Sequence, residues 1–139
     1  MKNTPEDREY KLYISYSWNF NPKACEKKKE FFRKGGLHYV FFESFQLEPS
    51  RSGISEEKYT VHISKLIADC DCLLILAGTS EEQHHWTRVE VEIARQKKKP
   101  VIVIEPWESS RTLPLLKDCA DALVKWHGKK ITDAIRNIA

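Results

Sequence analysis

The sequence lacks any long hydrophobic run. No apolar stretch approaches the ~20 residues that a helix needs to cross a bilayer, and the opening residues, MKNTPEDREYK, contain no apolar core of a signal peptide. The chain also has no internal repeat and no low-complexity tract. We therefore expect a cytoplasmic protein that does not span a membrane.

The sequence also lacks the usual metal and phosphate motifs. It has four cysteines, but the Cys70-x-Cys72 pair has no second pair with which to form a zinc site. Neither the GxxxxGK[ST] pattern of a P-loop nor the GxGxxG pattern of a dinucleotide fold is present. We predict no bound metal. Free, buried thiols are the favoured interpretation for the cysteines, which are Cys25, Cys70, Cys72 and Cys119.

Positive charge is modest and scattered. The net charge is +3, and the lysines form short runs at 27–29, 97–99 and 129–130. Each run lies beside a predicted helix end or exposed face, where solvated lysines are common. The sequence therefore favours a solvated helix surface over a nucleic-acid interface.

The remaining composition is that of a globular domain. Of the 139 residues, 41% are hydrophobic and 31% are charged, which is far from the composition of disordered chains. A chain of this length fits one domain with a substantial core. We expect a short tail at residues 1–10 and a single domain at residues 11–139.

Short β-branched and apolar runs alternate with helical patterns along this domain. Strands are predicted at residues 11–18, 37–42, 72–77, 100–104 and 122–126, and helices at residues 22–34, 55–69, 85–96, 113–119 and 130–138. The run CLLILA at 72–77 is almost continuously apolar, which indicates a central strand covered on both faces. The alternation predicts an α/β fold, a doubly wound five-stranded parallel sheet with helices on both faces.

The default strand order for such a sheet is 2-1-3-4-5, and its ligand crevice lies at the carboxyl ends of the first and third strands. The loops at this position are Ser15–Trp18 and Ala77–Ser80. They offer hydroxyl groups and aromatic rings but no carboxylate, which argues against a phosphoacceptor site that holds Mg²⁺. Asp71 opens the third strand at its opposite end, and we expect it to be a turn residue.

The predicted helix at 85–96 carries an acid on its apolar side. At about 100° per residue, Glu90 shares a stripe with Trp86 and Ile93, whereas Glu92 points to the opposite side. A buried carboxylate is costly unless something compensates for its lost hydration. The residues leave three compensations open: hydrogen bonds that cap a neighbouring backbone, an ion pair with an arginine, or a ligand group such as a pair of sugar hydroxyls.

Several stretches occur in one characteristic order and spacing. They are KLYISYSW at 11–18, IADCD at 67–71, LILAG at 74–78, Trp86-x-x-x-Glu90 and KPVIVI at 99–104. Together they resemble TIR domains, and more closely the ThsB-type TIR-like proteins of the Thoeris bacterial anti-phage systems. The resemblance extends from Lys11 to Ile138 and implies a TIR or flavodoxin-like fold.

The resemblance also implies an activity. In catalytic TIR domains, the acid four residues after the tryptophan cleaves NAD⁺ between nicotinamide and ribose, and this acid matches Glu90. Relatives of the Thoeris type join the ends of ADP-ribose into a cyclic second messenger that activates a separate effector protein. NAD⁺ would then be the substrate, with no cofactor. Cyclisation needs water to be excluded, which we assign to the aromatic rings of Trp18 and Trp86.

Further substrate-binding residues follow from the two crevice loops and the same helix. The predicted set is Tyr16, Ser17, Trp18, Gly78, Thr79 and Trp86. Ser17 and Trp18 are favoured over Ser15, which we expect to point into the sheet. Tyr16 stands where the resemblance leads us to expect histidine. Tyrosine donates a hydrogen bond but does not titrate near neutral pH, so a proton-transfer role at this position is in doubt.

The competing interpretation is a binding module. TIR-like domains in many signalling proteins assemble through helical surfaces without activity, and self-assembly of this kind fits a mildly charged, helix-coated domain. A sensor that binds a nucleotide without cleaving it is a third possibility. Glu90 discriminates among these, because a scaffold does not need an inward acid and a sensor would tolerate Glu90→Gln. We expect NAD⁺ as partner, and neither nucleic acid nor membrane.

Overall fold

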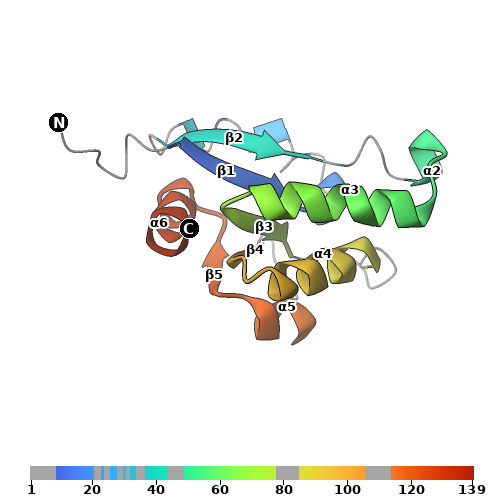
Figure 1. Cartoon of the computed structure of the whole chain (residues 1–139). Coiled ribbons are helices and arrows are strands. Elements are labelled where there is room, and N and C mark those ends of the chain that lie inside the picture. Colours follow the sequence, from blue (N-terminus) through green and yellow to red (C-terminus); the bar gives the residue numbers. More distant parts are fainter. Residues whose placement is uncertain are drawn as a thin grey trace.

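One parallel sheet organises the protein. The computed structural model describes residues 9–20, 23, 26, 27, 30, 32, 33, 37–43, 49–77, 85–105 and 114–139. Their strands are β1 (Glu9–Ile14), β2 (His38–Phe42), β3 (Cys72–Leu76), β4 (Val101–Glu105) and β5 (Ala122–Lys125). All neighbouring strands are parallel and follow the order β2-β1-β3-β4-β5 (Figure 1). The predicted fold class and strand order are confirmed.

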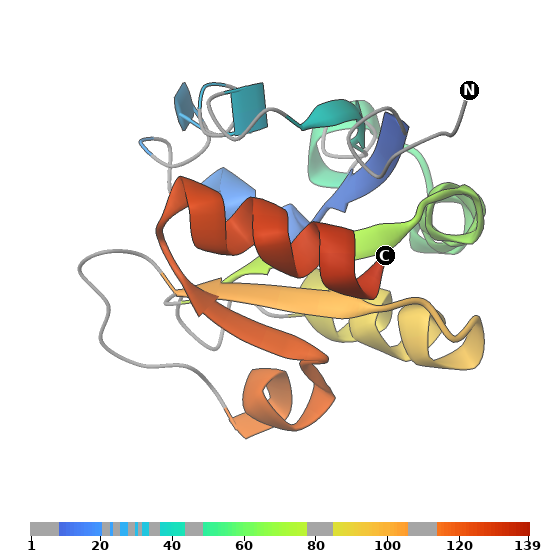
Figure 2. The ribbon, with the colours of Figure 1, turned by 90° about the vertical axis from the view of Figure 1, so that its left-hand side faces the viewer.

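Helices cover both faces of this sheet. They are the 3₁₀ helix η2 (Tyr16–Phe20) and the α-helices α2 (Pro49–Ser52), α3 (Glu56–Asp69), α4 (His85–Gln96), α5 (Pro114–Cys119) and α6 (Gly128–Ile138). α6 lies on one face, whereas α3 and α4 lie on the other (Figures 1 and 2). The helix predicted at 22–34 lies largely outside the described residues. No helix in the described ranges is long and apolar enough to cross a membrane.

β3 carries both hydrophobic cores. Its five residues are all fully buried. Leu74 and Leu76 face the cluster under α6, while Leu73 and Ile75 face the cluster under α3 and α4. Successive side chains of a strand point to opposite faces, so a strand covered on both sides must be apolar throughout. The prediction drawn from CLLILA is therefore confirmed.

β1 ends earlier than predicted. Its last residue is Ile14, and the predicted strand residues up to Trp18 instead form η2. The Ser15 carbonyl accepts from the Trp18 backbone N–H at 3.1 Å, and the Ser15 hydroxyl accepts from the Ser17 N–H, also at 3.1 Å. Serine commonly offers the backbone such local alternatives to a strand ladder. The strand therefore turns at the sheet edge, which brings the following residues over the end of β3.

Two aspartates bind backbone groups at the amino edge of the sheet, where the strands β3 and β5 begin. The Asp71 carboxylate accepts from the Lys11 backbone N–H at 2.7 Å, and the Asp71 N–H donates to the Lys11 carbonyl at 2.7 Å. Asp121 makes the same pair of contacts with Val101, at 2.7 and 2.8 Å. Each aspartate thus ties the turn before its own strand to the backbone of the neighbouring strand. The prediction that Asp71 is a turn residue is confirmed.

The cysteines in the described part of the chain carry thiols and form no disulfide. Cys70 and Cys72 are buried, and Cys119 is half-buried. Burial raises the pKa of the Cys70 thiol to about 12. These thiols therefore pack as small apolar groups, as predicted, while Cys25 lies outside the described residues.

Candidate active site

Glu90 lies inside the protein. Its side chain is 0% exposed, whereas Glu92, two residues along α4, is exposed. The buried side of α4 also includes Trp86 and Ile93, as the helical period predicts. The inward direction of the Glu90 carboxylate is therefore confirmed, and what compensates for its burial can be read from its contacts.

Three hydrogen bonds from β1 and the turn after it reach this carboxylate. The Tyr13 hydroxyl donates to Oε2 at 2.6 Å, and the Ser15 hydroxyl donates to Oε1 at 2.6 Å. The Tyr16 backbone N–H donates to Oε2 at 2.9 Å. No lysine or arginine in the described ranges forms an ion pair with Glu90. Of the compensations open from the sequence, hydrogen bonding that includes a backbone cap is the one observed.

A directed chain of hydrogen bonds ends at the same acid. The Leu76 backbone N–H donates to Ser17 Oγ at 2.9 Å, and the Ser17 hydroxyl donates to Ser15 Oγ at 3.0 Å. The Ser15 hydroxyl then donates to Glu90. Every hydrogen in this chain points toward the carboxylate, which suits an ionised acid because that form only accepts. The chain therefore links the end of β3, through the turn after β1, to Glu90 on α4.

Burial and hydrogen bonding act on Glu90 in opposite directions. Burial raises the pKa of Glu90 from its ordinary 4.5 to about 7, and the hydrogen bonds from Ser15, Tyr13 and the Tyr16 backbone lower it by less. A carboxyl group with this pKa populates both protonation states near neutral pH. Perturbed acids of this kind are concentrated at functional sites, although structural networks also produce them.

Trp18, predicted as a wall of the crevice, packs in a hydrophobic core. It is 1% exposed, and its indole N–H donates to the Leu74 carbonyl at 2.9 Å. Its ring packs against Trp126, with 5.8 Å between ring centroids, in the cluster under α6. This cluster lies across the sheet from the one that contains Tyr13. Past the end of β1, η2 directs this side chain into the core. These contacts give Trp18 a packing role, and its contact with a substrate stays a prediction.

The preference for Ser17 over Ser15 as a substrate-binding residue stays a prediction, and both side chains are buried beside Glu90. Ser15 contacts the acid directly, whereas Ser17 reaches it only through Ser15. Tyr13 was not singled out from the sequence at all. A signal for it exists, because Tyr13 and Ser15 are two residues apart and therefore lie on the same side of an extended chain.

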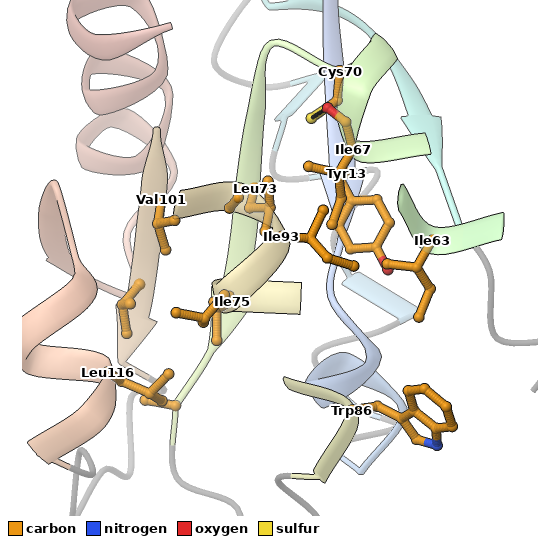
Figure 3. Packing of buried hydrophobic residues seen from close by; sticks show 14 of the residues in the cluster. Tyr13, Ile63, Ile67, Cys70, Leu73, Ile75, Trp86, Ile93, Val101 and Leu116 are labelled. Atoms are coloured by element: carbon orange, nitrogen blue, oxygen red, sulfur yellow. Dashed lines mark hydrogen bonds between the residues drawn. The ribbon is translucent and has the colours of Figure 1, made fainter. Parts of the chain in front are cut away.

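Trp86 lies between two helices. It is 8% exposed, and its ring meets the edge of the Tyr59 ring on α3, with 4.6 Å between centroids. His85 contacts it as well, at 4.8 Å between centroids. Figure 3 shows Trp86 at one end of the apolar cluster that contains Tyr13 and Ile63. These contacts give Trp86 a packing role, and its contact with a substrate stays a prediction.

Of the other predicted binding residues, only Tyr16 lies within the described part of the chain. Tyr16 is half-buried, and its backbone N–H binds Glu90. Gly78 and Thr79 lie outside the described residues, so their predicted roles stay predictions. In the ranges that are described, no group of three or more His, Cys, Asp or Glu side chains is placed to hold a metal ion.

A cavity of about 560 Å³ lies at the amino edge of the sheet, opposite the edge that holds Glu90. Its lining includes Arg95, Lys99, Asp118 and Asp121, which stand at helix ends and strand starts. Ligands of open α/β sheets bind at the carboxyl ends of the strands. Basic residues after the last turn of a helix also complement its dipole. The cavity is therefore separate from Glu90, and its cations are explained by the end of α4.

An open parallel sheet with a buried acid beside its point of reversal defines a doubly wound α/β domain with a candidate active site at the carboxyl edge. The family model for the Thoeris protein ThsB, TIR-like domain, matches residues 13–111, and the chain belongs to this family. No curated protein matches the chain.

Three solved structures are similar to the chain at low sequence identity. The CMP N-glycosidase BcmB of Clostridium botulinum is 12% identical, with a TM-score of 0.48 over 91% of this chain and 95% of that one. A 3-dehydroquinate dehydratase-like protein from Bifidobacterium longum is 8% identical, with a TM-score of 0.48 over 94% and 96%. The glutaminase domain of Trypanosoma brucei CTPS is 13% identical, with a TM-score of 0.43 over 69% and 36%. At these identities and TM-scores, none of the three structures indicates a function for this protein.

Proposed function

We propose that this protein is an NAD⁺-cleaving TIR-like enzyme of Thoeris anti-phage defence. It releases nicotinamide and converts the remaining ADP-ribose into a cyclic second messenger, which activates a separate effector protein. The observation that supports this proposal is the Glu90 carboxylate, buried at the carboxyl edge of the sheet and held by hydrogen bonds from Tyr13, Ser15 and the Tyr16 backbone.

The reaction gives a carboxylate at this position a task. When the bond between nicotinamide and the ribose C1′ breaks, its electron pair leaves with the nicotinamide nitrogen and positive charge develops on the ribose. An ionised Glu90 near the ribose hydroxyls stabilises that charge or orients the sugar. The interaction is stronger in a dry site than in water, because little solvent screens it. A nucleophile from the ADP-ribose itself then closes the ring, and water in its place would give linear ADP-ribose.

The ionisation of Glu90 sets the pH dependence of this chemistry. Only the ionised acid stabilises the oxocarbenium-like ribose, so nicotinamide release should rise as pH increases through about 7. Glu90 is fully covered here, and the ribose reaches it only when that cover opens. Closure around the substrate would keep water from C1′, as cyclisation requires.

A nucleotide-sensing or interaction module is the second candidate. One observation favours it: the chain itself supplies the hydrogen bonds to both oxygens of Glu90, so the acid is stabilised without a ligand. In this alternative, Glu90 fixes β1 to α4 and has no chemical role. The protein would then bind a nucleotide, or another copy of itself, without consuming NAD⁺.

Product analysis separates these candidates. Purified protein at high concentration, which favours assembly, is incubated with NAD⁺, and the products are identified by mass spectrometry. The enzyme predicts nicotinamide together with a product of the mass of ADP-ribose less one water. Nicotinamide with linear ADP-ribose alone would leave cleavage standing and refute the cyclic messenger. Binding of NAD⁺ without nicotinamide release would favour the sensor.

A further inference from the structure

Thr87 carries a buried hydroxyl group that has no partner. The buried polar or charged residues in the described part of the chain are Ser15, Ser17, Thr87, Glu90 and Thr132. All of them except Thr87 form at least one side-chain hydrogen bond there. Thr87 is 0% exposed, and within those same ranges its Oγ1 atom has no hydrogen-bond partner.

This situation is unusual for a threonine in a helix. Helical threonines commonly donate to a carbonyl three or four residues earlier. Thr60 does so to the Glu56 carbonyl at 2.9 Å, and Thr132 does so to the Lys129 carbonyl at 3.1 Å. A buried hydroxyl without a partner costs free energy that valine, with nearly the same shape, would not. Within the described part of the chain, no contact of the folded protein therefore explains a hydroxyl at residue 87.

The position of Thr87 supplies a reason. It lies in the first turn of α4, three residues before Glu90, and both belong to the buried side of the helix. Side chains three residues apart are neighbours on a helix surface. α4 follows β3, so its first turn stands at the carboxyl edge of the sheet (Figure 1). This is the edge at which open α/β sheets bind their ligands. Thr87 therefore lies one helical turn before the candidate catalytic acid, on the same buried side of α4.

The neighbourhood also restricts the chemistry of a ligand group. Glu90 repels an anion when it is ionised, and Arg88, the nearest cation along α4, is exposed rather than buried beside it. A threonine hydroxyl donates one hydrogen and accepts others. A neutral sugar hydroxyl matches it, because that group also both donates and accepts.

We infer that the Thr87 hydroxyl hydrogen-bonds a ribose hydroxyl of the bound nucleotide and so positions the sugar beside Glu90. This inference rests on the proposed function, because it names a further residue of that same site. Thr87 binds and positions the substrate, whereas Glu90 acts on the charge that develops during cleavage.

Two substitutions at this position and one control test the inference. Thr87→Val removes the hydroxyl and keeps the shape, and Thr87→Ser keeps the hydroxyl. Thr132→Val, on α6, removes a buried hydroxyl that does have a partner. For each full-length variant, the KM and kcat for NAD⁺, the calorimetric Kd for NAD⁺ and the thermal midpoint are measured.

We expect Thr87→Val to weaken NAD⁺ binding about tenfold with an unchanged or higher thermal midpoint. Thr87→Ser should bind within about threefold of the parent. Thr132→Val should show the reverse pattern, a lower midpoint with unchanged affinity. Parent-like NAD⁺ binding by Thr87→Val, or a lower midpoint in that variant, would overturn the inference and leave the proposed function intact. A parent protein that neither binds nor cleaves NAD⁺ would overturn both.

Discussion

Replacing Glu90 by glutamine should change how the stability of the protein depends on pH. The folded-state pKa of Glu90, about 7, lies above its ordinary 4.5 because of burial. Between these pH values the folded protein binds a proton that the unfolded chain has lost. Stability therefore falls as pH rises through this window, and the cost of the buried charge is fully present above the folded-state pKa.

The size of the effect follows from the same two values. They differ by about 2.5 pH units, and each unit corresponds to about 1.36 kcal/mol, so ionised Glu90 costs ~3 kcal/mol of folding free energy relative to the protonated acid. Glutamine cannot ionise. Hydrogen bonds rearranged around its amide change the stability by an amount that does not depend on pH. The pH dependence of the difference in unfolding free energy between parent and variant is therefore set by the charge of Glu90 alone.

Denaturant unfolding from pH 4.5 to 9 measures this difference. The free energy of unfolding of the parent relative to Glu90→Gln should fall by ~3 kcal/mol across this range. Glu92→Gln is the matched control, because it makes the same change at an exposed position of the same helix, and it should follow the parent. Other titrating groups cancel in the comparison.

Two outcomes would refute the reasoning. A parent-minus-variant difference that does not change with pH would mean that Glu90 titrates near its ordinary value, so burial would not dominate. A difference that grows with pH would mean that the folded protein stabilises the ionised acid, for which the described residues offer no cationic partner.

Three further substitutions test the surrounding structure. Tyr13→Phe removes a 2.6 Å donor to the ionised acid, so an NMR titration should find the pKa of Glu90 raised further above 7, and an unchanged value would contradict the assignment. Trp18→Phe loses packing and the indole hydrogen bond; we expect a loss of about 2 kcal/mol in urea unfolding with unchanged NAD⁺ affinity, whereas weaker binding at full stability would place the ring in the site. Asp121→Ala leaves the Val101 N–H without its acceptor and should cost about 1–3 kcal/mol in the same unfolding assay; an effect below about 0.5 kcal/mol would deny it a structural role.

Much of the fold could be predicted from local patterns. The apolar run of β3 required cover on both faces, and the alternation of strands and helices required a parallel sheet. The start of α3 was also predictable, since Ser55 is a typical N-cap residue and its hydroxyl accepts from the Lys58 N–H. These features depend on residues close in sequence, so their physical causes are visible in the sequence itself. The short helix α2 was not predicted.

The site was only partly readable, because its contacts join distant residues. The helical period was sufficient to predict that the Glu90 side chain points into the protein. It carried no information on which donors meet the acid, since Tyr13 and Ser15 are 77 and 75 residues away. The packing of Trp18 under α6 could not be predicted for a related reason. The direction of a side chain past a strand end depends on the turn, and here a serine turned the chain into η2. Thr87 was passed over because its hydroxyl is informative only once its burial is known.

The rate of nicotinamide release by the parent, Glu90→Gln and Glu92→Gln, measured side by side with saturating NAD⁺, tests the central claim most directly. We predict that Glu90→Gln loses at least about 10²-fold in rate, because a single group that stabilises transition-state charge is worth that much or more. Glu92→Gln should retain the parent rate. If Glu90→Gln releases nicotinamide as fast as the parent, or if the parent releases none, the buried carboxylate is structural and the assignment of this site to NAD⁺ cleavage is wrong.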